Sequence, residues 1–189
     1  VPYLPMGDVM FLDMVHKVFT ERGLFFYQVY FQDIGPPEAE LEADPAATIR
    51  KFYYAISGDA PDGTWPTDKK HGDTLLHRLP EPPMPLPWLS EEDVAYYDSQ
   101  FRKSGFRGPL NRYRNHARDY AFLKSHPANP VIQQPSLFVG GTKDLVLKMF
   151  QGDIVAAMKP NLADLRGCHL LEGCGHWTQQ ERPDAVNRY

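Results

Sequence analysis

The chain has 189 residues, which is enough to bury one hydrophobic core. Hydrophobic residues make up 42% and charged residues 23%, an ordinary balance that excludes wholesale disorder. The formal net charge of −4 gives no electrostatic basis for binding nucleic acid or an acidic membrane surface. No apolar run approaches the roughly 18 residues that a membrane-spanning helix needs. Two cysteines, Cys168 and Cys174, favour a reduced, cytoplasmic protein over a disulfide framework.

The first part of the chain predicts helices. Asp8 is a candidate N-cap for a helix that reaches about Arg22 and ends at Gly23. Asp44-Pro45 is a strong helix start, a capping residue followed by proline at the first helical position, and this helix is expected to end at Gly58. The segment Leu24–Phe31 is too short and too aromatic to assign to a helix or a strand.

Residues 58–87 are rich in Gly, Pro and Asp and predict a long loop. Its last part, Pro80–Pro87, must be extended, either as a stiff connector or as a polyproline ligand for a partner domain. Ser90–Asp93 is a capping-box variant that opens a helix ending at Gly105. Pro109 is expected to open another helix, with an inward stripe of Leu110, Tyr113, Ala117 and Tyr120.

The character of the sequence changes after Pro135. Ser136–Gly140 and Leu165–Leu171 are short apolar runs typical of buried parallel strands. Between them the pattern predicts one helix from about Leu145 to Lys159, and a further helix is expected to start at Pro183. This order of strands, loops and helices indicates α/β organisation.

Two polar residues follow the predicted strands. Asp144 comes four residues after Gly140, and His176 comes five residues after Leu171. In an open parallel sheet, chemistry sits beyond the carboxyl ends of the strands, and an acid that precedes a histidine matches the order in α/β-hydrolases. The same positions also suit two structural roles, a helix cap for Asp144 and a packed histidine beside glycine for His176.

Four separated segments carry a specific resemblance. They are Gly173-Cys-Gly-His-Trp-Thr-Gln-Gln-Glu-Arg-Pro183; Asp144-Leu-Val146; Ser104-Gly-Phe-Arg-Gly-Pro-Leu-Asn111 with Tyr113-Arg-Asn115; and Tyr27-Gln-Val-Tyr-Phe-Gln32 with Glu38–Glu42. Together they resemble, in the same order, the soluble epoxide hydrolases of the α/β-hydrolase fold. The resemblance implies an incomplete α/β-hydrolase, with a mainly helical cap over residues 1–130 and the C-terminal part of the core over residues 131–189.

The resemblance implies a role for four residues. In this family an aspartate opens the epoxide and forms a covalent ester, while two cap tyrosines donate hydrogen bonds to the epoxide oxygen. The matching positions are Tyr27 and Tyr113. His176 and Asp144 match the pair that activates water to hydrolyse the ester. No metal or cofactor is implied.

Four more residues are expected to line the substrate pocket: Gln28, Phe31, Leu145 and Trp177. Tyr113 also has a structural interpretation, as a core tyrosine on the apolar stripe of its helix, and Tyr30 competes with Tyr27 for the role of first tyrosine. Arg112 departs from the family, which usually has a bulky aromatic residue there. This departure puts the packing of the surrounding helix in doubt.

The nucleophile is not found in the sequence. The chain has neither a Gly-x-Ser-x-Gly nor a Gly-x-Asp-x-Gly elbow, and His71-Gly72 makes a poor oxyanion loop because it follows polar residues. Val1–Pro5 matches the segment that follows the strand before the cap. We therefore expect the nucleophilic aspartate in an absent N-terminal half, so that the chain alone would be inactive. A longer protein, a second chain or a homo-oligomer would complete the site.

Other functions are less well matched. A haloalkane dehalogenase needs halide-binding donors such as tryptophan in place of the paired tyrosines, and an esterase would be identified by its missing elbow residue. A non-catalytic protein that binds a hydrophobic ligand would use the same aromatic pocket. The seven histidines lack the HExxH spacing, which argues against a metal hydrolase.

Overall fold

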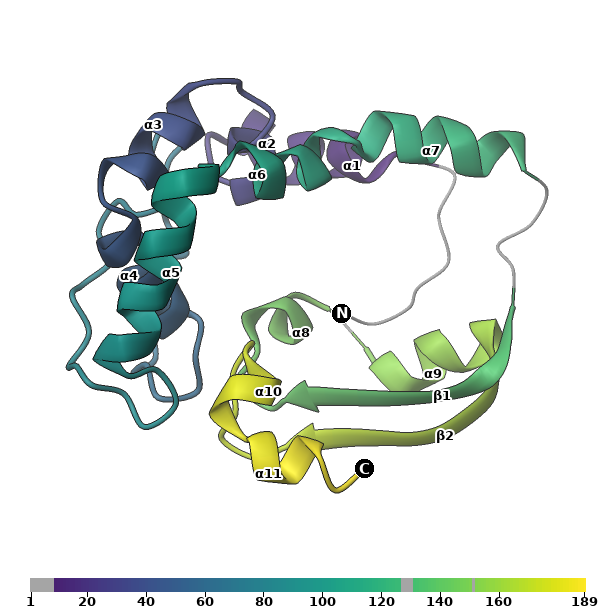
Figure 1. Ribbon diagram of the computed structural model, residues 1–189. Helices are drawn as coiled ribbons and strands as arrows, with labels where there is room; N and C mark the ends of the chain where they lie inside the picture. Colours follow the sequence, from purple (N-terminus) through teal and green to yellow (C-terminus); the bar gives the residue numbers. More distant parts are fainter. Residues whose placement is uncertain (1–8, 127–130, 151) are drawn as a thin grey trace.

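A computed structural model describes residues 9–126, 131–150 and 152–189. Figure 1 shows a bent layer of helices above a small sheet. Helices α4 and α5 run down one side, and α6, α7 and α1 cross the top, while the sheet and the last helices lie below. Asp8 and Val1–Pro5 lie outside the described residues.

Among the residues that the structure describes, the helical layer contains seven α-helices and one short 3-10 helix. They are α1 (Phe11–Val18), η1 (Thr20–Arg22), α2 (Tyr27–Tyr30), α3 (Pro36–Ala43), α4 (Pro45–Ala55), α5 (Glu91–Ser104), α6 (Arg107–Arg114) and α7 (His116–Ser125). The lower part contains β1 (Ile132–Gly141), α8 (Leu145–Met149), α9 (Ile154–Met158), η2 (Lys159–Asn161), β2 (Leu162–Leu171), α10 (Thr178–Glu181) and α11 (Pro183–Val186). No described helix has the length and apolar character to cross a membrane.

Two helix N-termini were predicted from capping side chains, and both are confirmed. The Asp44 carboxylate accepts a hydrogen bond from the Ala47 amide at 3.1 Å, and Pro45 is the first residue of α4. Ser90 and Asp93 form the reciprocal capping box of α5, with hydrogen bonds of 3.1 Å and 2.9 Å. Gly105 ends α5 at a φ of 65°, a left-handed conformation that favours glycine. The start of α11 at Pro183 is confirmed as well.

Three predicted helices are wrong in their extent. The helix expected to reach Arg22 stops at Val18, and a 3-10 turn follows, in which the Arg22 amide donates to the Phe19 carbonyl and the Gly23 amide to the Thr20 carbonyl. The helix expected at Pro109 starts at Arg107 and breaks at Asn115. Its expected stripe does not continue, since Ala117 in α7 is exposed.

The single helix expected over residues 145–159 is instead two helices, α8 and α9. Gly152 has a φ of 120°, which a helix cannot accommodate. Asp153 then caps a new helix, because its carboxylate accepts from the Val155 and Ala156 amides at 2.9 Å and 3.1 Å. The sequence pattern had shown the apolar residues but not this local cap.

The predicted loop over residues 58–87 is confirmed to lack helices, and its only ladder contacts among described residues are two isolated bridges, Leu24–Lys70 and Leu86–Leu89. Parts of this loop complete the two cores of the helical layer. One core contains Ile49, Tyr54, Ala60, Leu86, Leu89 and Val94. The other contains Phe31, Leu41, Leu75, Phe106 and Leu110, with Tyr27 and Tyr113 packed against it. The loop is therefore a structural part of the helical layer.

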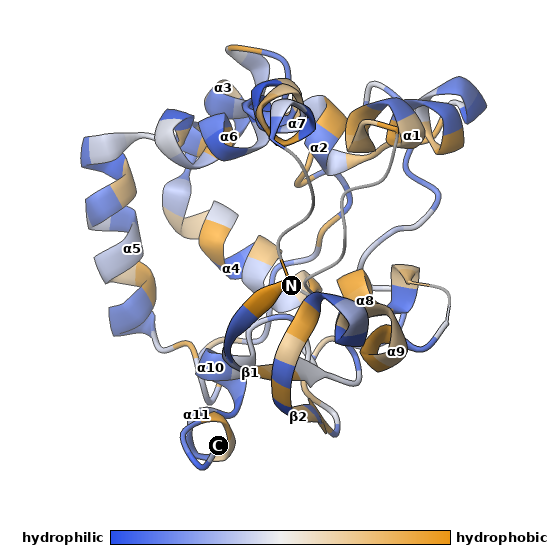
Figure 2. Ribbon diagram, turned by 90° about the vertical axis from the view of Figure 1, so that its right-hand side faces the viewer, coloured by the Kyte–Doolittle hydropathy of each residue, from blue (hydrophilic) through white to orange (hydrophobic). Residues whose placement is uncertain are grey.

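Strands β1 and β2 pair in parallel, as predicted. Leu137 pairs with Gly167, and the pairing continues without a register shift until Gly141 pairs with Leu171. Among the described residues the strands are buried only in part, since Phe138 is 9% exposed but Leu137 is 46% and Leu170 49% exposed. The reason is that the sheet core, made of Phe138, Met158 and Leu162, gathers where α9 packs on one face. Figure 2 shows the apolar character of these strands and of α8 and α9.

Candidate active site

The structure brings Asp144 and His176 together at the carboxyl ends of the two strands. Asp144 follows β1 and His176 follows β2, and His176 Nδ1 lies 3.0 Å from Asp144 Oδ1. The Asp144 side chain is 12% exposed and the His176 side chain 27%. Because a carboxylate only accepts hydrogen bonds, Nδ1 must carry the hydrogen. This contact fixes the orientation of the imidazole and leaves Nε2 for proton transfer.

The structural interpretation of Asp144 as a helix cap is confirmed, and the same carboxylate contacts His176. Asp144 Oδ1 accepts from the Val146 amide at 2.8 Å, so the residue is also the N-cap of α8. The cap holds the carboxylate in one rotamer, and that rotamer points it at His176. A structural role and a histidine-orienting role therefore share one side-chain position.

The loop that carries His176 is built from close backbone contacts. A Cβ atom on Gly175 would overlap the backbone of Ser57 and Gly58, and one on Gly58 would overlap the Gly173 carbonyl oxygen. A Cβ on Gly141 would overlap the Cys174 carbonyl in the same way. Glycine is required at these positions because no side chain fits between the backbones.

Glu181 holds this loop together. Its side chain is buried and accepts three backbone amides: Gly58 and Gly175, both at 2.8 Å, and Trp177 at 3.0 Å. These three donors come from the end of the α4 segment and from both sides of His176. Charge-assisted hydrogen bonds of this kind are about twice as strong as neutral ones. Glu181 thus fixes the backbone on either side of His176.

Further bonds tie the histidine loop to α4. The His176 amide donates to the Ile56 carbonyl at 3.0 Å, and Trp177 Nε1 donates to the Tyr53 carbonyl at 2.9 Å. The Trp177 ring also stacks on the Tyr53 ring, with centroids 4.2 Å apart. The position of His176 is therefore set by the helical layer as well as by the sheet.

Tyr27 and Tyr113 lie side by side in the helical layer. Their rings meet edge to face with centroids 5.8 Å apart, and both pack near the buried Phe31 ring. Burial raises the pKa of each phenol, so both keep their protons at neutral pH. The negative charge of Asp144 makes a smaller contribution in the same direction to the pKa of Tyr27.

Arg112 does not disturb this packing. The residue is exposed, and α6 packs through Leu110, which is 2% exposed, and through Tyr113. Tyr30, the competitor of Tyr27, donates instead to Glu40 at 3.0 Å. That bond directs the Tyr30 hydroxyl away from Tyr113 and toward α3.

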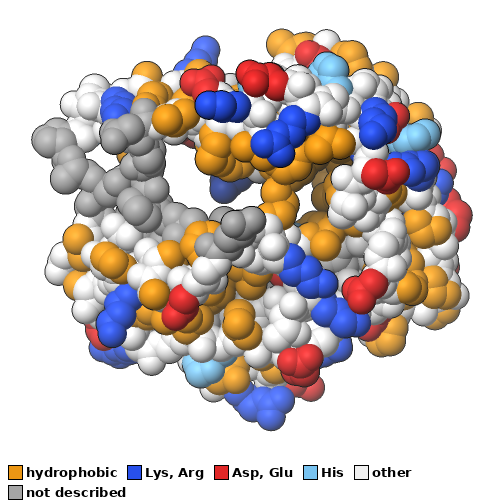
Figure 3. All heavy atoms as spheres, turned by 180° about the vertical axis from the view of Figure 1, so that it is seen from behind, with side chains coloured by type: hydrophobic (Ala, Val, Ile, Leu, Met, Phe, Trp, Pro, Cys, Tyr) orange, Lys and Arg blue, Asp and Glu red, His pale blue; other side chains and the backbone are white. Residues whose placement is uncertain are grey.

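One cavity is lined by the acid and histidine, and a second lies beside the residues that flank the acid. One of about 220 Å³ is lined by Phe138, Val139, Asp144, Leu147, His176, Trp177, Thr178 and Gln179. A second, of about 460 Å³, lies between the loop of residues 60–68 and the residues that flank Asp144, including Lys143 and Leu145. Figure 3 shows hydrophobic side chains on both sides of the opening between the helical layer and the sheet.

The residues expected to line a pocket divide into two groups. Trp177 lines the smaller cavity and Leu145 the larger one. Gln28 and Phe31 line neither of these two cavities; Phe31 is 5% exposed within the core, and Gln28 hydrogen-bonds to Tyr27. No cluster of His, Cys, Asp or Glu suited to a metal ion occurs among the described residues.

The positions and contacts of three residues were not predicted from the sequence: Glu181, Gly58 and His116. Gly58 had been interpreted as a helix stop, whereas it accommodates the histidine loop. Glu181 carried no signal of its own because its three donors are backbone amides, two of them near in sequence and one 123 residues away. The paired glycines Gly173 and Gly175 were the available sign that another backbone approaches closely.

Known proteins are similar to this chain along most of its length. No protein-family model matches the sequence. Epoxide hydrolase A of Mycobacterium tuberculosis is 37% identical over 193 residues, which cover 98% of this chain and 56% of that protein.

Two solved structures superpose on the whole chain. Epoxide hydrolase A from Mycobacterium thermoresistibile does so with a TM-score of 0.87 and 35% identity, and 57% of it is covered. An epoxide hydrolase from an endophytic Streptomyces gives a TM-score of 0.88 and 39% identity, with 56% covered. The chain spans about half the length of these relatives. It is therefore related, along its whole length, to epoxide hydrolases of the α/β-hydrolase fold.

Proposed function

We propose that this chain forms part of an epoxide hydrolase, which opens a small hydrophobic epoxide to a vicinal diol through a covalent ester. The observation that carries the proposal is that one molecule contains both a pair of hydrogen-bond donors and a histidine paired with a carboxylate, which can act as a base. Tyr27 and Tyr113 are adjacent protonated phenols, and His176 is paired with Asp144 at 3.0 Å. Ring opening needs the first pair and ester hydrolysis needs the second.

In the first step, a carboxylate oxygen attacks one carbon of the epoxide. The bond between that carbon and the ring oxygen breaks, and the ring oxygen gains the electron pair. Tyr27 and Tyr113 donate hydrogen bonds to this oxygen, and one of them supplies a proton. Their raised pKa values favour the protonated form needed for donation.

In the second step, water attacks the carbonyl carbon of the ester. His176 takes a proton from the water at Nε2, and Asp144 stabilises the imidazolium through Nδ1. The tetrahedral intermediate then collapses: the ester C–O bond breaks, and the diol leaves with the proton that His176 had taken. The regenerated carboxylic acid loses its proton, and the tyrosine that gave a proton in the first step regains one. The pair therefore acts after ring opening and not during it.

The attacking carboxylate is proposed to come from an aspartate outside the 189 residues, on a longer chain or a second one. We further propose that residues 1–130 act as the cap and 131–189 as part of the catalytic core. A cytoplasmic location and a detoxifying role are also part of the proposal; the free thiols Cys168 and Cys174 support a reducing location.

The test uses the complete protein, including the segment that supplies the carboxylate, with styrene oxide and stilbene oxide as probes. Diol formation is expected, and the double variant Tyr27→Phe/Tyr113→Phe should lose at least about 100-fold of the alkylation rate. Tyr96→Phe is the matched control because Tyr96 is 64% exposed. His176→Gln should still react once and accumulate an ester that mass spectrometry detects. A complete protein that binds these epoxides without forming diol or ester would overturn the proposal in favour of a binding protein.

A further inference from the structure

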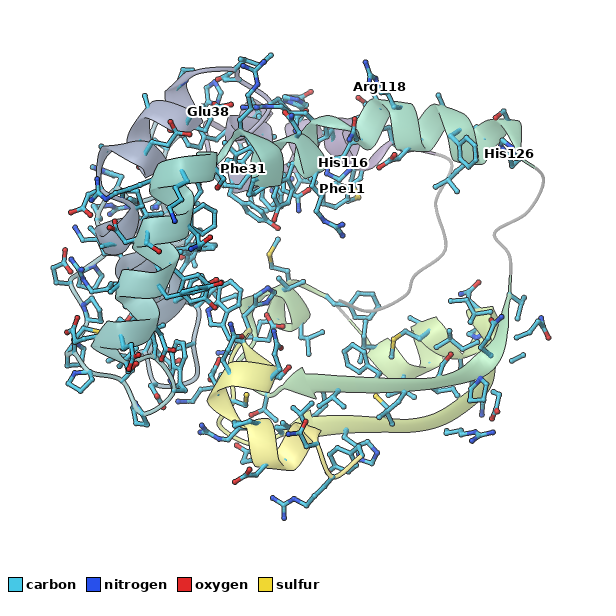
Figure 4. All side chains as sticks on the ribbon, in the orientation of Figure 1. Phe11, Phe31, Glu38, His116, Arg118 and His126 are labelled. Carbon is cyan, nitrogen blue, oxygen red and sulfur yellow. The ribbon has the colours of Figure 1, made fainter. Side chains whose placement is uncertain are left out.

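A histidine outside the proposed catalytic set reaches Tyr27 through one glutamine. His116 is the first residue of α7, at the break after α6. Its Nε2 lies 2.8 Å from Gln28 Oε1, and Gln28 Nε2 lies 2.7 Å from the Tyr27 hydroxyl. Figure 4 shows His116 on the side of the helical layer that faces the sheet, close to Phe11.

The two ends of the Gln28 amide have different chemistry. The oxygen only accepts hydrogen bonds and the nitrogen only donates them. Because the oxygen faces His116, Nε2 of the histidine must carry a hydrogen. The nitrogen of Gln28 therefore faces Tyr27, and the phenol oxygen accepts its hydrogen bond. The proton of Tyr27 is then left for another acceptor.

The reverse orientation would have the opposite effect. If the amide oxygen faced Tyr27, the phenol would donate its proton to Gln28 instead. A neutral tyrosine has one proton to give, so it could not also donate to an epoxide oxygen. The direction of the Gln28 amide thus decides whether Tyr27 is a donor to a ligand.

The surroundings hold His116 and Gln28 in place. The imidazole lies against the Phe11 ring, with centroids 5.6 Å apart, and burial lowers the pKa of His116. The backbone of Gln28 is fixed by Gln32, whose Nε2 donates to the Gln28 carbonyl at 2.8 Å and to the Tyr113 carbonyl at 3.1 Å. The same glutamine therefore links the backbones that carry both tyrosines.

We propose that His116 is a positioning residue that sets the direction of the Gln28 amide and so keeps the Tyr27 proton available to the substrate oxygen. The inference rests on the proposed function only because it takes the acceptor of the Tyr27 proton to be an epoxide oxygen. The relay itself, from His116 through Gln28 to Tyr27, is a property of this chain.

The first test does not depend on turnover. NMR of the Gln28 side-chain amide should show one Nε2 proton shifted downfield and protected from exchange by its bond to Tyr27. His116→Met removes the donor and should shift that signal toward the position of a free amide. His116→Gln keeps a donor of similar reach and should restore it. His126→Met is the matched control, because His126 is exposed at the other end of α7.

The second test uses the alkylation rate of the complete protein with styrene oxide. His116→Met should lower this rate about 10-fold with little change in KM, and His116→Gln should recover most of it. Gln28→Glu should lower the rate further, because a carboxylate can only accept and would take the Tyr27 proton.

The outcomes separate the two proposals. If His116→Met leaves both the Gln28 amide signal and the alkylation rate at the values of the control, the inference is wrong. If the amide signal responds but no form of the protein opens an epoxide, the relay stands and the proposed function fails. If His116→Met does not fold, the alkylation rates of Gln28→Glu and His116→Gln are compared instead. His116→Gln is expected to keep most of the rate and Gln28→Glu to lose it, and equal rates would contradict the inference.

Discussion

The helical layer and the sheet region of this molecule differ in how completely they are packed. The helical layer has two buried cores rich in aromatic residues, and the loop of residues 58–87 completes both. The sheet region has a core of three buried residues, and leucines on its strands are about half exposed. Two-stranded sheets are marginal by themselves. The contrast indicates that the helical layer is stabilised by its own buried cores, whereas the sheet region depends on its contacts with the helical layer.

The junction between the two regions carries the proposed base. His176 and Asp144 lie on the less packed side, yet the histidine loop is held by Ile56, Gly58 and Tyr53 of the helical layer. Lys143, next to Asp144, likewise donates to the Gly58 carbonyl at 2.8 Å. The comparison therefore predicts larger effects at the junction and in the core of the helical layer than on the sheet surface.

The largest effect is expected for Gly58→Ala. The added methyl group would overlap the Gly173 carbonyl oxygen, so one of the two backbones must move. We expect a loss of more than about 3 kcal/mol in the free energy of unfolding, measured by urea denaturation. Gly108→Ala is the control, because nothing lies within 4 Å of its Cβ position and it sits inside α6. A Gly58→Ala variant as stable as this control would mean that the junction is not tightly packed.

Glu181→Gln should follow. The substitution keeps the shape of the side chain but replaces one of the two accepting oxygens by a donor, which faces backbone amides. We expect a loss of about 2–4 kcal/mol, together with a changed His176 ring signal in NMR. The exposed Glu92, at the start of α5, provides Glu92→Gln as a control with little expected change. An unchanged His176 signal would argue against a positioning role for Glu181.

Within the helical layer, the pair of Glu38 and Arg114 should give a pH dependence. Hydrogen bonds from Arg114 lower the pKa of Glu38 from 4.5 to about 2. A carboxyl group with a lowered folded-state pKa contributes stability that is present above about pH 4.5 and is lost as the pH falls toward 2. Arg114→Met should remove about 1–3 kcal/mol of unfolding free energy at pH 7 and flatten the decline between pH 4.5 and 2.

The surface pair of Arg102 and Asp98 serves as the control for this measurement. Arg102 is 57% exposed, so solvent screens the pair, and Arg102→Met should leave the pH profile nearly unchanged. If Arg114→Met and Arg102→Met gave the same profile, the partly buried pair would have no special role in the helical layer.

The smallest effect is expected for Leu170→Thr on the sheet. Leu170 is 49% exposed, so the change should cost less than about 1 kcal/mol. Leu110→Ala in the helical core, at 2% exposure, should cost about 2–5 kcal/mol. Urea denaturation of the two variants side by side measures the contrast directly. Equal losses would show that the two regions are packed alike.

Several features could be predicted from the sequence because they depend on near neighbours in the chain. Asp44 and Ser90 cap helices through amides three residues away, and each prediction is confirmed. The parallel strands were predictable from their apolar runs, and the order of Asp144 before His176 located both groups after the strands. The catalytic roles of Tyr27, Tyr113, Asp144 and His176 remain proposals that the experiments above test.

Other features were decided only by the tertiary structure. The three amides held by Glu181 and the link from His116 to Gln28 join residues up to 123 positions apart. The sequence alone thus determined which local elements form and which groups they carry. The direction in which each group points was decided by backbones and side chains brought together in space, since hydrogen-bond partners of this kind leave no periodic trace in the chain.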